Sequence, residues 1–297
     1  MSYQTGTATD AANLKSLIET FAQANGWTLT SGALTCSFGA VKLTTELLSG
    51  STWQRLRVSG ADDAAFTTNV CSVPPALGLY AASWPVTYHL FAFATPVPVL
   101  FCIIQYDSGM HQHLAFGGMV KYGTWGGGLW ISASIGNIYD AFLDRPFLVT
   151  QDYSSSWDPF GHAGAIFWKG YRVGQYTRPA SALRCDLDGS SVPWTVQADV
   201  IATFDPLQKR MPAAWNNQVQ LLPYNLAVPR PSGFWSIVGQ IPWIRATRNT
   251  YLEPGDVITE GSDRWKVFPW VKRDAANPAG GQGHSGTVAV ALYYDGP

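Results

Sequence analysis

The 297-residue chain is rich in apolar and aromatic residues and poor in charge. Hydrophobic residues make up 46% of it and charged residues only 13%, with a formal net charge of −1. This composition disfavours a disordered chain, which needs many charges and few aromatic residues. It also argues against a nucleic-acid partner, because phosphate binding needs several basic side chains on one face. A weakly charged surface suits contacts with other subunits. The alternative is one very large core inside an ordinary polar surface.

The opening sequence MSYQTGTATD has neither the basic nor the apolar region of a signal peptide. The most apolar window, residues 89–105, is interrupted by Pro96 and Pro98 and is too short to span a bilayer. We therefore expect a protein that folds in a cytoplasm without membrane insertion. The cysteines form no Cys-x-x-Cys pair, and we expect all of them to be reduced thiols: Cys36, Cys71, Cys102 and Cys185.

Apolar residues at helical spacing predict one helix near the N-terminus. Thr9 or Asp10 can cap its start, and Asn25-Gly26 supplies its stop. Its apolar stripe consists of Leu14, Leu17, Ile18 and Phe21. A helix of about 15 residues is marginal alone, so this stripe must pack against the rest of the chain. The preceding residues 1–7 are expected to form a tail that reaches a neighbouring subunit.

After Gly26 the apolar pattern changes to a period of two, which indicates β-strands. Residues 27–38 are typical of a hairpin with a Ser31-Gly32 turn. Further strands are predicted at residues 41–48, 53–58, 86–94, 99–106, 129–134, 165–171, 196–203, 218–222, 263–271 and 287–294. Gly and Pro separate these short strands, as they do in sandwiches and barrels.

The predicted fold is mainly β (α+β), an antiparallel β-sandwich or barrel-like body with a short N-terminal helix. Residues 1–50 are expected to form a helix and hairpin region, and residues 51–297 a strand-rich body. Within that body, residues 205–233 are rich in proline and are expected to form an extended connecting segment.

His111 and His113 are the strongest candidates for a metal site. Residues two apart on a strand share a face, so both imidazoles can reach one ion, with His89 as a third ligand. The simpler interpretation is a polar strand face whose histidines hydrogen-bond to their neighbours. We favour it because three-ligand sites are usually marked more strongly. We therefore expect no metal ion and no other cofactor.

The remaining motifs point to no catalytic or nucleotide site. A strand, not a helix, is predicted to follow the glycines at 117–118 and 126–128, unlike the order in a phosphate-binding loop. Residues 186–190 (DLDGS) lack the spaced ligands of a calcium loop and are predicted to form a turn. No Gly-x-Ser-x-Gly elbow or Cys–His pair stands out. We therefore expect no enzymatic activity. A hydrolase, which needs two carboxylates across a cleft, is the weakest alternative.

Tryptophan is unusually frequent in the strand-rich body, with 13 in the whole chain. Exposed aromatic rings can bind a glycan or another subunit, whereas core packing explains buried ones equally well. The sequence leaves these uses open. The candidates for an interface or glycan contact are Trp125, Trp130, Trp265 and Trp270.

Several short segments of the sequence resemble segments of structural proteins of tailed phages and prophages. They are the opening residues 1–8, residues 24–28 (ANGWT), residues 113–118 (HLAFGG), residues 121–128 (KYGTWGGG) and residues 261–270 (GSDRWKVFPW). They are spread over most of the chain and include no catalytic signature. The resemblance implies a component of the tail or baseplate, with no catalytic residues to transfer.

These features predict a structural subunit of a tailed phage virion that acts through protein–protein assembly contacts in the tail or baseplate. Its partners would be other phage structural proteins and copies of itself in a symmetric assembly. The protein would be located in the virion and be assembled in the bacterial host cytoplasm. The alternative is a glycan- or receptor-binding module of the phage tail that engages a host surface glycan.

Overall fold

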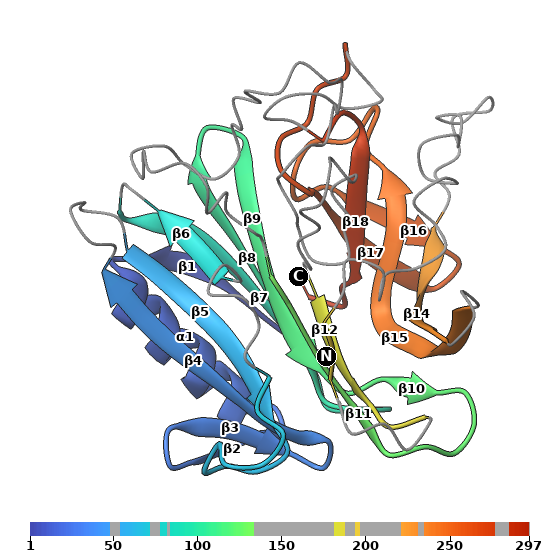
Figure 1. The fold of residues 1–297 in the computed structure, drawn as a ribbon. Coiled ribbons are helices and arrows are strands. Elements are labelled where there is room, and N and C mark those ends of the chain that lie inside the picture. Colours follow the sequence, from blue (N-terminus) through green and yellow to red (C-terminus); the bar gives the residue numbers. More distant parts are fainter. Residues whose placement is uncertain are drawn as a thin grey trace, which may run out of the picture.

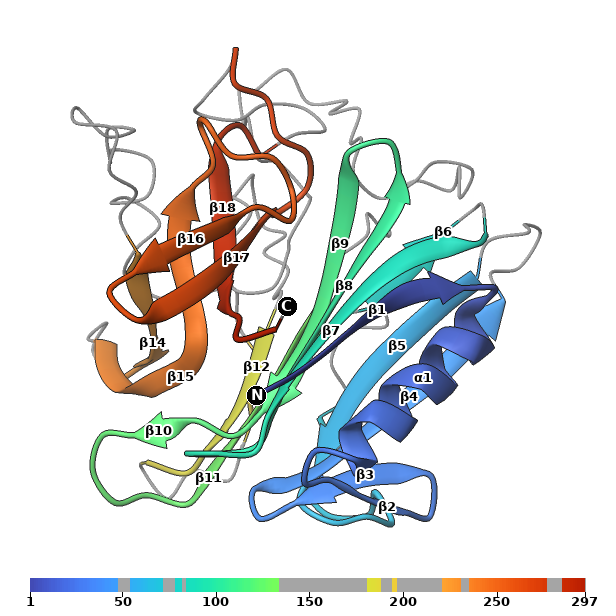
Figure 2. The same cartoon turned by 180° about the vertical axis from the view of Figure 1, so that it is seen from behind.

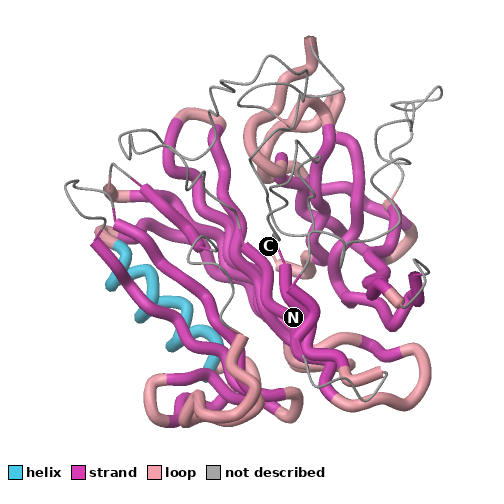
Figure 3. Tube along the Cα trace, viewed as in Figure 1, coloured by secondary structure: helices cyan, strands magenta, loops and turns pink. Residues whose placement is uncertain are grey.

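The computed structural model of the protein describes residues 1–47, 54–71, 78–81, 84–133, 181–187, 194–196, 221–230, 235–276 and 285–296. These residues form three antiparallel sheets and one helix (Figures 1 and 3). The prediction of a mainly β, antiparallel fold with a short N-terminal helix is confirmed.

The helix α1 (Ala11–Gln23) begins and ends close to the predicted positions. The side chain of Asp10 caps it by accepting a hydrogen bond from the backbone N–H of Asn13 at 2.7 Å. Gly26 follows the helix with a φ of +91°, a backbone conformation that side chains rarely adopt. Leu17 is only half-buried. The buried residues of the helix are Ala11, Leu14, Ile18, Phe21 and Ala22.

A five-stranded sheet follows the helix. Its order is β2 (Thr28–Thr30), β3 (Ala33–Cys36), β4 (Gly39–Leu47), β5 (Gln54–Ala61) and β6 (Gly78–Ala81). The predicted hairpin is formed by β2 and β3, whose register pairs Leu29 with Leu34. Because β4 pairs with β5 along its whole length, the boundary expected at residue 50 falls inside this sheet.

A seven-stranded sheet forms the centre of the molecule. Its order is β1 (Ser2–Ala8), β7 (Val86–Phe93), β8 (Val99–Asp107), β9 (Met110–Gly117), β11 (Gly127–Ala133), β12 (Ser181–Cys185) and β13 (Trp194–Val196). The expectation that residues 1–7 form a tail is wrong, because residues 2–8 pair with β7. The Tyr3 ring fixes this strand by packing against Phe91 and Tyr294, with ring centroids 4.9 and 5.0 Å away.

The third sheet has six strands. Its order is β10 (Val120–Lys121), β15 (Trp235–Arg248), β18 (Val288–Tyr293), β17 (Asp263–Pro269) and β16 (Val257–Glu260), and β14 (Leu222–Pro229) also pairs with β15. The strand β14 corrects the expectation of a connecting segment over 205–233, because its backbone follows β15 through two register shifts. Residues 205–220 and 231–233 of that segment lie outside the described residues, as do the predicted strands at 165–171 and, apart from Val196, at 196–203.

The seven-stranded sheet lies between the other two. The five-stranded sheet and α1 flank it on one side, and the six-stranded sheet packs on the other (Figure 2). Helix α1 contacts β4 and β5 as well as β7, so its apolar stripe joins two sheets. One continuous apolar core links all three sheets and the helix. A smaller second cluster consists of Trp265, Val267, Ala289 and Ala291.

We predict that Leu14→Ala lowers the free energy of unfolding by about 2–5 kcal/mol, because it removes a fully buried side chain between two sheets. Leu17→Ala is the matched control and should cost clearly less, since Leu17 is only half-buried. Urea unfolding at pH 7 measures both values. Equal losses for the two variants would contradict the packing of α1 described here.

Candidate functional site

The four tryptophans named as candidates for a glycan or subunit contact are buried in this structure. Trp130 and Trp270 are fully buried, and the Trp130 indole N–H donates a hydrogen bond to the Gly118 carbonyl at 2.7 Å. Trp125 and Trp265 are 9% and 3% exposed. Their rings fill the spaces within and between sheets, which leaves them no surface for a ligand in this structure. The sequence could not distinguish core packing from a surface contact, because an aromatic ring suits a buried core and an exposed binding surface equally well.

The glycine-rich stretch at residues 117–128 surrounds the side chain of Phe38. A Cβ atom on Gly118 would lie 2.6 Å from the Phe38 ring, so only glycine fits there. The Lys121 ammonium lies 5.8 Å from the centre of the Phe38 ring and 4.8 Å from that of Trp125. It also donates a hydrogen bond to the Trp125 carbonyl at 2.8 Å. As predicted, a strand, β11, follows these glycines, which serve close packing.

The histidines His89, His111 and His113 share one face of the seven-stranded sheet. His89 and His113 are both register partners of Ile103, and His111 is two residues from His113. The prediction that His111 and His113 lie on one face is therefore confirmed. His111 and His113 are almost completely buried. Burial lowers the pKa of His89 and of His111 to about 4 and that of His113 to about 3, so all three are neutral at pH 7.

Each imidazole has its own hydrogen-bond partner. His113 donates from Nε2 to the Pro269 carbonyl at 2.9 Å, and His111 donates from Nδ1 to the Gly109 carbonyl at 3.1 Å. The Tyr3 hydroxyl shares a hydrogen bond of 2.8 Å with Nδ1 of His89. Among the described residues, no group of three or more His, Cys, Asp or Glu side chains is arranged to hold a metal ion.

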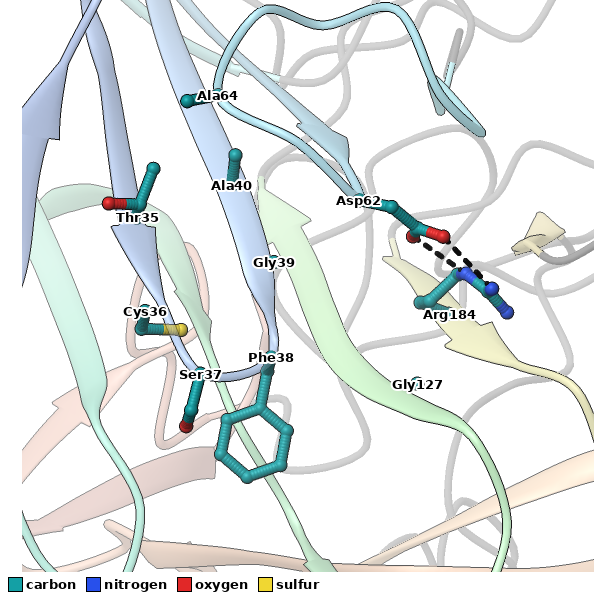
Figure 4. A pocket seen from close by; sticks show the side chains of 10 residues that line it. All are labelled: Thr35, Cys36, Ser37, Phe38, Gly39, Ala40, Asp62, Ala64, Gly127 and Arg184. Carbon is teal, nitrogen blue, oxygen red and sulfur yellow. Dashed lines mark hydrogen bonds and ion pairs between the residues drawn. The ribbon is translucent and has the colours of Figure 1, made fainter.

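A pocket of about 400 Å³ opens between the turn that joins β3 to β4 and the start of β11 (Figure 4). Residues 35–40 line one side of it, and Asp62, Ala64, Gly127 and Arg184 line the other. The Arg184 guanidinium holds the Asp62 carboxylate through two hydrogen bonds of 2.7 and 3.0 Å. This pair ties the loop after β5 to β12.

Burial and hydrogen bonding shift the pKa values of two groups in this pocket, Asp62 and Cys36. Burial would raise the pKa of the Asp62 carboxyl, but hydrogen bonds from Arg184 and Asn69 outweigh that effect and lower it. Asp62 therefore stays ionised at neutral pH and has no proton to donate. Burial raises the pKa of the Cys36 thiol, which stays protonated and is a weak nucleophile. The pocket can hold a small polar molecule, which would meet an ionised Asp62 carboxylate and a protonated Cys36 thiol.

The outermost strands of the sheets form a second kind of site. Among the described strands, the first and last in each sheet order have a neighbour on only one side. Soluble proteins usually protect such strands with charged residues, proline or bulges. The edge strands β1 and β2 carry no charge, proline or bulge: their sequences are SYQTGTA and TLT, and their registers run without a shift. The strand β2 is three residues long, so β1 offers the longer edge.

The outer side of these two strands is open within the described part of the chain. No backbone hydrogen bond joins the outer side of β1 or β2 to another described segment. All three residues of β2 are exposed, including Leu29, and so are Thr5 and Thr7 of β1. Both strands can therefore accept a further strand from another chain. Sequence reasoning missed β1, although its Tyr and Thr residues favour a strand.

No protein-family model and no curated protein matches this chain. None of the helices that the structure describes has the length and apolar character needed to cross a bilayer.

We predict that chelation with EDTA leaves the melting temperature unchanged, because no group of three or more His, Cys, Asp or Glu side chains among the described residues is arranged to hold a metal ion. Differential scanning fluorimetry with and without EDTA measures this. A drop of several degrees that added zinc reverses would show that a metal ion stabilises the fold.

Proposed function

We propose that this chain is a structural subunit of a tailed phage virion, in the tail or baseplate, and that it assembles through its sheet edges. The single observation that carries the assembly role is the pair of uncharged, open edge strands β1 and β2. An edge without charges or proline pairs readily with another strand, which is a hazard for a protein that must stay monomeric. For a subunit of a larger assembly the same edge is a binding site.

The low charge of the chain supports the same proposal. Charged residues make up 13% of the sequence, and the exposed apolar residues include Leu29 on β2 and Val120 on β10. Contacts between subunits through such surfaces need little desolvation of charge. The phage identity rests on the resemblance of the sequence. The glycan-binding alternative has less support, because the four tryptophans named as candidates for it, Trp125, Trp130, Trp265 and Trp270, are buried.

We expect Thr7→Lys on β1 and Leu29→Lys on β2 to weaken self-association at least about fivefold, because lysine on an edge strand opposes strand pairing. Thr87→Lys is the matched control: Thr87 is exposed and lies directly opposite Thr7, but on an interior strand. Sedimentation velocity over a range of concentrations measures association, and the melting temperature verifies folding. If the edge variants and the control associate equally, the edges are not the contact.

Mass spectrometry of purified virions tests the location of the protein. Particles from a host that carries this gene should contain the chain in many copies, as expected for a subunit of a symmetric assembly. Virions that lack the chain would contradict the proposal, whatever the purified protein does in solution.

A further inference from the structure

The contact between the seven-stranded and six-stranded sheets contains an unusual concentration of imidazole. We define the intersheet seam as His89, His111 and His113 together with Phe268 and Trp270. The Phe268 ring lies between two of the histidines, with ring centroids 4.9 Å from His89 and 6.2 Å from His111. Trp270 packs against His113 at 5.2 Å. Every histidine of the seam thus touches an aromatic ring from β17 or the residue after it.

The six-stranded sheet meets the histidines with aromatic rings and with backbone carbonyls. Phe268 and Trp270 are buried and present the rings. The Pro269 carbonyl accepts from Nε2 of His113 at 2.9 Å, and the Val271 carbonyl accepts from the backbone N–H of His111 at 2.7 Å. These hydrogen bonds and the ring contacts join the histidines to the six-stranded sheet. An imidazolium in this position would lose its water without gaining an anion.

The charged groups around the seam oppose protonation. Lys266 on β17 acts on His89 with a positive charge, and His111 acts on both His89 and His113. The ammonium of Lys266 lies above the rings of Tyr3 on β1 and Tyr294 on β18, at 5.0 and 4.5 Å. Burial raises the pKa of Tyr3, which is therefore neutral. No carboxylate of the described residues acts on His89 or His111.

We propose that the seam is an acid-sensitive contact, and that protonation of its histidines near pH 5 separates β17 from β9 while the five-stranded sheet stays folded. This inference does not depend on the proposed function. A protein with this device changes its shape, and exposes Phe268 and Trp270, when its surroundings become mildly acidic.

The pH window follows from the sign of the shifts. The ordinary pKa of histidine is 6.5, and in the folded protein it falls to about 4 for His89 and His111 and about 3 for His113. Between these values the open form binds more protons than the closed form, so the closed form loses stability as the pH falls below 6.5. For His89 and His111 this loss of stability of the closed form is complete near pH 4. Protonation of several groups in one window makes the transition steep.

The ion pairs around the five-stranded sheet respond to acid in a different pH range. Its ion pairs involve Glu46 with Arg55 and Arg57, and Asp62 with Arg184. The pKa values of both carboxyls are lowered: for each, burial raises the pKa, but hydrogen bonds from its arginine partners outweigh that effect. These pairs therefore stabilise the fold down to a pH below the ordinary carboxyl value. The seam should open first.

Hydrogen exchange with mass spectrometry, on samples equilibrated from pH 7 to pH 4 and corrected for intrinsic rates, tests the proposal. Peptides from residues 110–117 and 263–271 should lose protection with a midpoint between about pH 4 and 6, while residues 39–47 keep theirs. Simultaneous loss of protection in all three regions would overturn the proposal, because it would indicate global unfolding. Full protection of the seam down to pH 4 would overturn it as well.

Neutral isosteres identify the groups responsible. His113→Gln keeps a donor for the Pro269 carbonyl, and His111→Asn keeps one for the Gly109 carbonyl. Each should lower the midpoint of seam opening by at least about half a pH unit, and the double variant by more. Asp62→Asn, outside the seam, should leave the midpoint in place. Midpoints unchanged in both histidine variants would overturn the assignment.

A measurement on the unaltered protein covers the case in which a variant fails to fold. Nuclear magnetic resonance titration of the imidazole C–H signals should give apparent pKa values below about 5.5 for the three seam histidines. Values at or above 6 for His89 and His111 would overturn the proposal, because the closed seam would then tolerate the charged form.

Discussion

The packing of β17 against the face of the seven-stranded sheet is the contact on which the arrangement of the two larger sheets depends. The seven-stranded sheet presents imidazoles there, and β17 presents Phe268 and Trp270. A buried polar group is tolerated only when it is hydrogen-bonded, and each histidine meets that condition while it is neutral. The protonation state of these rings therefore determines whether the two sheets can stay together.

The same contact explains features that otherwise look unrelated. Residues 1–8 become a strand because Tyr3 reaches both His89 and Tyr294 at the edge of the seam. The first and last strands of the described chain meet as a result, and the terminal ammonium of Met1 lies 3.7 Å from the carboxylate of Asp295. Its Asp295 side chain is half exposed, and an ion pair open to solvent on one side contributes little to stability by itself. Its position follows from the packing of the rings beside it.

Sheet closure is the second constraint. None of the three sheets closes into a complete barrel in the described residues, so each leaves open edges. The protein fills its interior with aromatic residues but does not protect β1 or β2 with charge. A sequence of low charge can form a large core and still leave edge strands that pair with other strands. The core depends on buried apolar residues, whereas edge protection depends on charged residues and proline in the outermost strands. This combination is what links the fold to the proposed assembly role.

The sequence by itself determined the class of fold, the single helix and most of the strands of the first half of the described chain, because these depend on local periodicity and turn residues. It also placed His111 and His113 on one face, since alternation along a strand is a local property. Only the tertiary structure decided that Trp125, Trp130, Trp265 and Trp270 are buried, that residues 1–8 join a sheet, and that β14 runs through a proline-rich segment. Each of these outcomes depends on a partner that is distant along the chain: β7 for residues 1–8, β15 for β14, and Gly118 for Trp130. The periodicity of one segment contains no information about which distant segment covers it, so burial and pairing were settled by the packing of whole sheets.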